Sequence, residues 1–299
     1  MTMDLDAKPR PAGRLFVVAT PIGNRLDLSA RAIATLQAVA TVACEDTRHS
    51  APLLAAIGSR ARLVALHDHN EQQASEPLLA QLAQGEDLAL ISDAGTPLIS
   101  DPGFRLVQKA AALNVEIVPI PGPSALIAAL SVAGLPSDRF AFEGFLPAKT
   151  QARRAALSAL NDDPRTLVWY EAPHRIAATL DDAAVILGAE RKAVLARELT
   201  KTFETVLRGS LGELASRVRS DRNQQRGEIV LLVAGAQAST ASARQLAEGE
   251  RIFALLQKEL PASSAVRLAA EISGASKNAL YRLLGPGASG AAAAPADDA

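Results

Sequence analysis

The sequence contains a single cysteine, Cys44, among its 299 residues. One thiol can form neither an internal disulfide nor a zinc site built from several cysteines, and a buried thiol is the simpler interpretation. No uninterrupted apolar run approaches the length of a membrane span, and the opening MTMDLDAKPRPAG lacks the apolar segment of a secretory leader. We therefore expect a cytoplasmic protein with no membrane partner.

Excess charge of either sign is also lacking, because 31 basic residues balance 32 acidic ones to a formal net charge of −1. A protein of this charge has no global attraction for polyanions, so any contact with RNA must be local. A Walker A pattern does not occur, which leaves a phosphate-cradling loop unsupported. The 48% of hydrophobic residues is enough for two compact domains.

The first half of the chain alternates short apolar segments with helical patterns such as LSARAIATL. The apolar segments are LFVVAT, TVACED, RLVALH, DLALISD and VEIVPIP. Continuous apolar strands separated by helices are typical of a parallel sheet that is covered on both faces. The pattern predicts an α/β domain over residues 14–135, and GLPSDR then interrupts it as an interdomain connection would.

The second half repeats the α/β pattern over residues 136–236. Its candidate strands are 140–145, 166–172, 192–199, 204–211 and 227–235. Little helix separates the third and fourth, which predicts a mixed sheet with some antiparallel pairing. Helices near 241–259, 262–272 and 276–284 form a small segment over 237–286, and the low-complexity residues 287–299 are expected to be disordered.

Ligands in open α/β sheets bind beyond the carboxyl ends of the strands. In this chain those positions carry TPIGN, EDTRHS, HDHNE, SDAGTPLISDPG, PGPSA, YEAPHR and RELTKTFE. All four histidines of the sequence fall inside these segments, a coincidence that favours one shared cleft.

Several of these segments also have a plainer interpretation. The glycines of AGTP and PGPS can let a ligand approach the backbone, but tight turns need them as well. The two histidines of HDHNE would make a weak metal site, and substrate hydrogen bonding or helix capping by Asp68 and Asn70 is the stronger interpretation, so we expect no metal. EDTR can be simply the start of a helix.

Long motifs in order along the chain carry a more specific signal. VATPIGNRLDLSARAIATL, CEDTRHSAPLL, HDHNE, ISDAGTPLISDPG, VPIPGPSALIAALSVAGLP, FEGFLP, YEAPHR and RGEIVLLVAG together resemble the ribosomal RNA small subunit methyltransferase I family, from about Leu15 to Gly235. Tetrapyrrole methylases, which share the superfamily, typically carry G-x-G-P-G-D and G-D-P loops where this chain has ATPIGN and DAGTP. The comparison therefore points away from a tetrapyrrole substrate.

The resemblance implies an α/β fold of the tetrapyrrole methylase type, with S-adenosyl-L-methionine in the cleft between two α/β domains. It also implies a homodimer that methylates the ribose 2′-hydroxyl of a cytidine in the decoding region of 16S ribosomal RNA, within the small ribosomal subunit. Carried over from the family, the cofactor-binding residues are Pro21, Asp93, Ala94, Gly95, Thr96, Pro97, Ser124, Ala125, Tyr170, Glu171, Ala172, Ala196, Arg197, Glu198, Leu199, Gly227, Glu228 and Ile229.

Methyl transfer from a sulfonium is an in-line displacement, and the ribose hydroxyl must give up or share its proton. A carboxylate or histidine within reach is the expected acceptor. The candidates, which the sequence does not rank, are Glu45, Asp46, His49, His67, His69 and His174.

Phosphates near the target require local positive charge, and arginine binds phosphate in a bidentate manner. The candidate RNA-binding residues are Arg25, Arg48, Lys149, Arg153, Arg154, Arg175 and Lys201. The segment VRLAAEISGASKNALYRLL has a helix, a short glycine turn and a second helix, a form that also occurs in DNA-binding modules.

Three other functions remain open at this stage: a tetrapyrrole or other small-molecule methyltransferase of the same fold, an enzyme resembling diphthine synthase that acts on a protein, and a non-enzymatic regulator that reads DNA with its C-terminal helices. The last leaves the strand-end segments unexplained.

Overall fold

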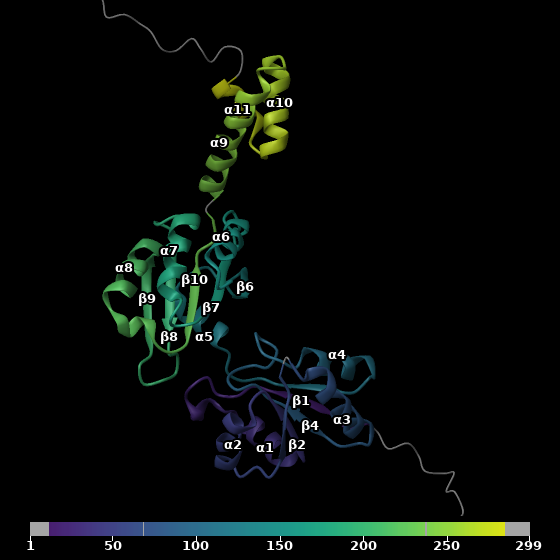
Figure 1. Ribbon diagram of the computed structural model, residues 1–299. Helices are drawn as coiled ribbons and strands as arrows, with labels where there is room; N and C mark the ends of the chain where they lie inside the picture. The colour runs from purple at the N-terminus through teal and green to yellow at the C-terminus, as the bar shows by residue number, and fades with distance from the viewer. Residues whose placement is uncertain (1–11, 68, 237, 285–299) are drawn as a thin grey trace, which may run out of the picture. The chain divides into compact units, whose positions relative to one another are not determined.

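The computed structural model describes residues 12–67, 69–236 and 238–284 (Figure 1). Contacts within the chain divide it into two compact units, Met1–Ser158 with Thr166–Ala234 and Ala159–Arg165 with Gly235–Ala299. The predicted disordered tail, 287–299, lies outside the described residues. No helix within the described ranges is long and apolar enough to cross a membrane.

The first sheet of the larger unit has the strand order β3-β2-β4-β1-β5, and every pair in it is parallel. Its strands are β1 (Leu15–Val18), β2 (Thr41–Cys44), β3 (Arg62–Ala65), β4 (Leu88–Leu90) and β5 (Ile117–Ile120). The helices between them are α1 (Ala30–Ala38), α2 (Thr47–Ala56), α3 (Glu71–Ala83) and α4 (Phe104–Ala112), with a 3-10 turn η1 (Arg25–Asp27) ahead of α1.

Successive side chains of the first sheet enter two separate cores. Leu88 and Leu90 of β4 pack with residues of α3 and α4, whereas Ala89, between them, packs with residues of α1 and α2. Strand side chains alternate between faces, so each strand must be apolar throughout when helices cover both sides. The predicted parallel sheet, covered on both faces, is confirmed.

The second sheet has the strand order β6-β7-β10-β8-β9. β6 (Phe140–Phe145) and β7 (Thr166–Glu171) are parallel, whereas β10 (Ile229–Val233) pairs antiparallel with β7 and β8 (Lys192–Arg197), and β8 pairs antiparallel with β9 (Thr205–Ser210). The predicted mixed sheet is therefore confirmed. The intervening elements are α6 (Thr150–Ala159), α7 (Ile176–Leu187), α8 (Leu211–Ser220) and the 3-10 turn η2 (Arg222–Gln225).

Helix α5 (Ala125–Ala133) follows the last strand of the first sheet but packs on the second. Its Leu126 and Ala129 join Val168 and Val230 in one buried core, which also includes Ile22 from the loop after β1. The loops at the carboxyl ends of β1 and β5 are therefore held against the second sheet.

The smaller unit contains α9 (Ala238–Leu256), α10 (Ala262–Ser273) and α11 (Lys277–Leu284), each within three residues of its predicted bounds. Its core includes Phe253, Val266 and Leu280. Gly274 ends α10 in the left-handed conformation, at φ 69°, which is the usual backbone of a glycine helix terminus.

Candidate cofactor cavity

A cavity of about 340 Å³ lies within the larger unit, where loops that follow strands of the first sheet meet the second sheet. Many of the predicted cofactor-binding residues line it: Ala94, Gly95, Thr96, Ala125, Tyr170, Glu171, Ala172, Ala196, Leu199, Glu228 and Ile229. The lining residues that sequence reasoning missed are Ile22, Ile99, Ser100, Asp101, Phe145, Pro173 and Val230. Ile99, Ser100 and Asp101 belong to the SDAGTPLISDPG motif, whose length could have indicated them.

The loop after β4 is fixed by its backbone. Thr20 and Gly95 exchange two backbone hydrogen bonds, of 2.8 and 3.1 Å between nitrogen and oxygen. The Thr96 hydroxyl donates to the Pro123 carbonyl oxygen at 3.0 Å. Gly95 has a φ of 85°, and a Cβ there would lie 3.3 Å from the Ile22 side chain. A glycine is needed at this position both for its backbone conformation and for the close packing.

The same loop continues in an unusual backbone conformation up to α4. Leu98 and Ser100 have φ values of 73° and 66°, a region that side-chain-bearing residues rarely adopt. The buried Glu71 carboxylate accepts hydrogen bonds from the Gly103 and Arg105 amides, at 3.2 and 2.6 Å, and so caps the start of α4. Strain of this kind persists where surrounding contacts enforce it, often at functional sites.

Aromatic rings form part of the cavity wall on the second sheet. The Tyr170 ring centroid lies 4.8 Å from that of Phe142 and 5.8 Å from that of Phe145, both in edge-to-face arrangement. The Tyr170 hydroxyl accepts a hydrogen bond from the Leu126 amide at 3.2 Å, and burial raises its pKa. These contacts hold the tyrosine between α5 and the cavity.

Glu198 and Gly227, both predicted to bind cofactor, lie outside the cavity lining and pack against each other beside Glu228. The Glu198 carboxylate accepts from the Glu228 amide at 2.9 Å and pairs with Lys201 at 3.0 Å. Gly227 has a φ of 75°, and a Cβ there would lie 2.3 Å from the Glu198 carboxyl. Lys201 also pairs with Glu228 at 3.1 Å, so its charge is engaged within the protein.

The other predicted cofactor residues outside the lining have identifiable places. The buried Arg197 guanidinium donates to the Phe203 carbonyl and the Thr205 hydroxyl, at 3.0 Å each, and holds the β8–β9 loop. Asp93 accepts a hydrogen bond from the Asp46 amide at 3.2 Å. Ser124 precedes α5, and Pro21 and Pro97 are half-buried and buried in the loops after β1 and β4.

Three carboxylates line the cavity, and each has a different environment. Glu171 is buried and accepts from the Thr179 hydroxyl at 2.6 Å, with Arg175 beside it. Glu228 is paired with Lys201. Asp101 is half-buried, and burial first, then the charge of Glu45, raise its pKa to about 6 despite a hydrogen bond with Ser92.

The predicted catalytic residues Glu45, Asp46, His49, His67, His69 and His174 do not line this cavity. Asp46 begins α2, accepts from the Arg48 amide at 2.8 Å and pairs with the Arg48 guanidinium at 2.7 Å. The hydrogen bonds from Arg48 lower the Asp46 pKa to about 2, which makes it a poor proton acceptor. EDTR therefore has the helix-start role that the sequence left open.

The four histidines do not meet in one cleft. The His67 and His69 rings are 6.1 Å apart, while His49 is exposed on α2 and His174 is exposed in the loop after β7. Asn70 precedes α3 but accepts from the His67 amide at 2.8 Å rather than from a helix amide, and Asp68 lies outside the described residues. Over the ranges that the structure covers, no group of three His, Cys, Asp or Glu residues could hold a metal ion.

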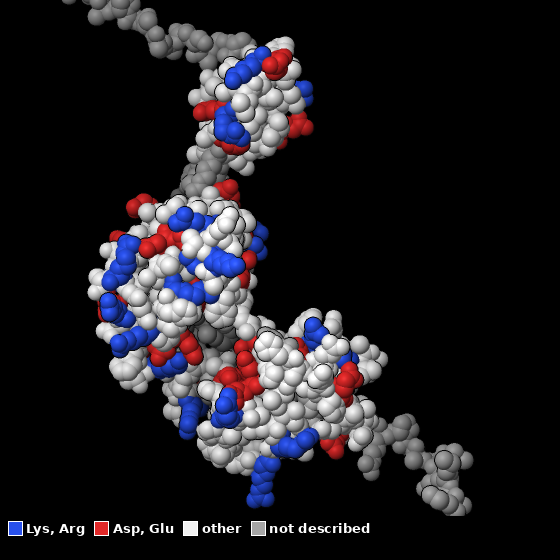
Figure 2. All heavy atoms as spheres, in the orientation of Figure 1, with Lys and Arg blue, Asp and Glu red and all other residues white. Residues whose placement is uncertain are grey.

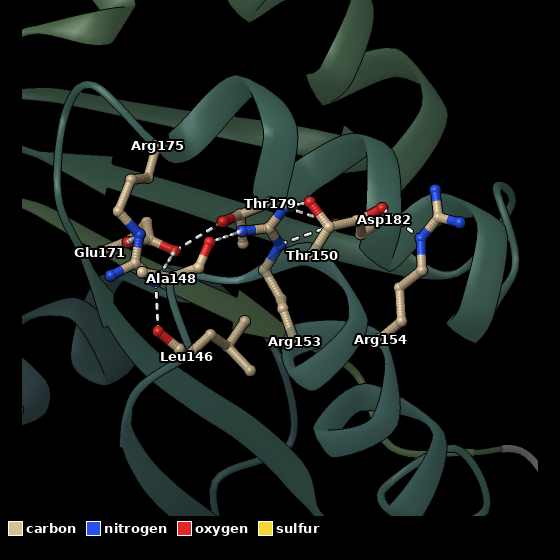
Figure 3. Close-up of polar contacts among 9 residues, drawn as sticks. All are labelled: Leu146, Ala148, Thr150, Arg153, Arg154, Glu171, Arg175, Thr179 and Asp182. Atoms are coloured by element: carbon tan, nitrogen blue, oxygen red, sulfur yellow. Dashed lines mark hydrogen bonds and ion pairs between the residues drawn. The ribbon is translucent and has the colours of Figure 1, made fainter.

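Two of the predicted RNA-binding arginines are structural (Figure 3). Arg153 is only 4% exposed and pairs with the buried Asp182 at 2.6 Å, while its guanidinium also donates to the Ala148 carbonyl at 3.1 Å. Arg175 donates to the Leu146 carbonyl and pairs with Glu171 at 3.1 Å. Their guanidinium groups are committed to internal partners, so a role in binding phosphate is wrong for Arg153 and disfavoured for Arg175.

Other basic candidates remain at the surface. Arg25, Arg48 and Lys149 are exposed, and Arg154 is 52% exposed although it also contacts Asp182. In Figure 2, basic and acidic side chains are interspersed over the visible face, without one extended basic surface. Any electrostatic attraction for RNA is therefore local, as the near-zero net charge predicts.

Two family models match the chain. The model described as Tetrapyrrole (Corrin/Porphyrin) Methylases matches residues 14–215, which include the cavity loops of the first sheet. The model described as RsmI C-terminal HTH domain matches residues 243–285, over the three C-terminal helices.

Individual proteins extend the comparison. Ribosomal RNA small subunit methyltransferase I of Pseudomonas aeruginosa is 58% identical over 271 residues, which cover 91% of this chain and 96% of that protein. The crystal structure of the methyltransferase CobJ has a TM-score of 0.57 at 18% identity, over 75% of this chain and 95% of that one. Uroporphyrin-III C-methyl transferase from Thermus thermophilus, complexed with S-adenyl homocysteine, has a TM-score of 0.52 at 18% identity, over 74% and 97%.

Proposed function

Because the chain belongs to the ribosomal RNA small subunit methyltransferase I family, we propose that it transfers a methyl group from S-adenosyl-L-methionine to 16S ribosomal RNA of the small subunit. The acceptor in this proposal is the ribose 2′-hydroxyl of a cytidine in the decoding region. The observation that carries the proposal is the cavity, in which long family motifs from both sheets line one space.

The residues present fit this cofactor. A volume of about 340 Å³ is within the usual range for small-molecule sites. Gly95 lines the cavity without a side chain, which allows close approach of a ligand, and the Phe145 and Tyr170 rings offer flat apolar surface for adenine. The Asp101 carboxylate provides negative potential for a cationic sulfonium.

The chain's residues contribute position and electrostatics to the reaction. When bound, S-adenosyl-L-methionine supplies an electrophilic methyl carbon on a positively charged sulfur. Alignment of the ribose oxygen with this carbon supplies a large part of the rate, since in-line geometry turns a bimolecular encounter into a unimolecular step. The loop fixed by Thr20, Gly95 and Thr96 is rigid enough to hold that geometry.

RNA contact in this proposal uses Arg25, Arg48, Lys149 and Arg154, together with α11. The exposed face of α11 carries Lys277, Asn278, Tyr281 and Arg282 and no acidic residue. Lysine and arginine can bind phosphates, while a half-exposed tyrosine can stack on an unpaired base. The protein is also proposed to act as a homodimer, which sedimentation velocity at micromolar concentration would test.

Mapping of 2′-O-methyl sites in ribosomal RNA tests the function directly. RNA from cells with and without this protein would be compared, and purified protein would then be added to 30S subunits from the deficient cells. We expect one cytidine to lose its 2′-O-methyl group and to regain it in vitro. Methyl incorporation into a base, or into a tetrapyrrole precursor instead of RNA, would refute the proposal.

A further inference from the structure

Three carboxylates line the cavity, and two of them already have cationic partners within the protein. Glu171 accepts hydrogen bonds from the Ala172 amide and the Thr179 hydroxyl, at 2.8 and 2.6 Å, and lies beside the Arg175 guanidinium. Glu228 is paired with Lys201 at 3.1 Å. Both carboxylates are therefore held in contacts with cationic side chains of the protein.

Asp101 has the opposite environment. The charged groups that act on its carboxyl are the carboxylates Glu45 and Asp93, while Ser92 provides a hydrogen bond. It projects from the strained loop after β4, one residue beyond Ser100 with its φ of 66°. Glu71 caps the following helix, and this fixes the loop on its far side. The position is therefore rigid, lies at the cavity and carries an unneutralised negative charge.

We propose that Asp101 is the catalytic residue that accepts the proton of the attacking hydroxyl. This inference rests on the proposed function, because it takes the acceptor to be a ribose 2′-hydroxyl. None of the six acceptors expected from the sequence lines the cavity, and Asp46 among them is held by Arg48.

The ribose oxygen forms a bond to the methyl carbon with its own electron pair, the carbon–sulfur bond breaks, and that pair stays on sulfur as the sulfonium charge is lost. The hydroxyl proton moves to an Asp101 carboxylate oxygen and then to solvent. Glu45 and Asp93 assist, because a neighbouring negative charge makes the carboxylate more basic while it remains mostly ionised at neutral pH.

Asp101→Asn tests the proposal, since it keeps the shape of the side chain and removes its basicity. The full-length protein would be assayed on 30S subunits in single turnover from pH 5 to 9, at saturating S-adenosyl-L-methionine. The parent rate should rise with pH and level off above a midpoint of about 6. The variant should lose this rise and react roughly 10²- to 10⁴-fold more slowly, the usual contribution of a general base.

Two further measurements exclude a merely structural or binding role. Calorimetric titration with S-adenosylhomocysteine should give similar Kd values for the parent and Asp101→Asn. Carbon-13 carboxyl resonances of the parent should include one that titrates near pH 6 and is missing from the variant. Asp87→Asn is the matched control, because Asp87 pairs with Arg14 at the surface and immediately precedes β4, whereas the cavity loop follows β4.

Glu45→Gln sharpens the test. Removing that charge lowers the Asp101 pKa, so the midpoint of the rate profile should move to lower pH. A parental rate and pH profile in Asp101→Asn would overturn the proposal, and so would a defect that disappears at saturating cofactor. If the methyl group is found on a base rather than on the ribose, the proposed function itself fails, whatever Asp101 does.

Discussion

Two buried or half-buried aspartates of the larger unit differ in the charges around them. Asp182, on α7, is 3% exposed and lies between Arg153 and Arg154, whose contacts of 2.6 Å outweigh the effect of burial and lower its pKa (Figure 3). Asp101, at the cavity, faces Glu45 and Asp93, and its pKa is raised. The Asp182 carboxylate is neutralised by two arginines and supports the fold. The Asp101 carboxylate lies beside other carboxylates at the cavity, where it is available to accept a proton.

The largest expected effect on stability comes from breaking the neutralised cluster. Arg153→Ala leaves the buried Asp182 with only its half-exposed partner, and loss of one member of a buried pair typically costs about 3–5 kcal/mol. Urea unfolding at pH 7 would measure this loss. Arg154→Ala is the control, and we expect it to cost less than about 1 kcal/mol, because Arg154 is 52% exposed. Equal losses in the two variants would contradict this interpretation.

A smaller effect of opposite sign is expected at the cavity. The folded-state pKa of Asp101 is raised from 3.8 to about 6, so its contribution to stability is present below pH 3.8 and is lost as pH rises through 6. At pH 8 the charged carboxylate therefore destabilises the fold, and Asp101→Asn should raise the free energy of unfolding by about 1–3 kcal/mol. Urea unfolding at pH 8 and pH 4 would test this.

The gain in Asp101→Asn should vanish at pH 4, where the parent carboxyl is protonated in the folded state. A gain of the same size at both values would mean that packing, and not charge, causes it. A variant that is more stable at pH 8 and slower in methyl transfer would show that the protein gives up stability to keep a base in its cavity.

The smallest effect is expected where charge is exposed and paired at the surface. Arg48 is 89% exposed, so Arg48→Ala should leave the free energy of unfolding nearly unchanged. If Arg48 contacts a phosphate, the same variant should weaken RNA binding and reduce the slope of log affinity against log salt by about one. Filter binding at several salt concentrations would measure the slope, and an unchanged slope would remove Arg48 from the RNA surface.

The cavity and the arginine cluster also differ in how well the sequence predicts them. Gly95 and Thr96 lie in the loop after β4 and Tyr170 lies near the end of β7, where open sheets place ligands, and all three line the cavity. Arg153 follows Lys149 in a polar helix start and has the appearance of a surface residue. Its partner Asp182 is 29 residues away, and a single sequence gives no sign that the two meet.

Within the described residues, sequence alone determined the ten strands, the parallel and the mixed sheet, and the loops that form the cavity, because apolar periodicity and turn residues are local properties of the chain. Tertiary structure alone decided that α5 packs on the second sheet, that Arg153 is buried against Asp182, and that Asp101 faces the carboxylates of Glu45 and Asp93. The physical reason is that burial and electrostatic potential depend on distances between segments far apart in the sequence. The sequence therefore shows which residues are of a type that can accept a proton, and the structure around each residue decides which of them can do so.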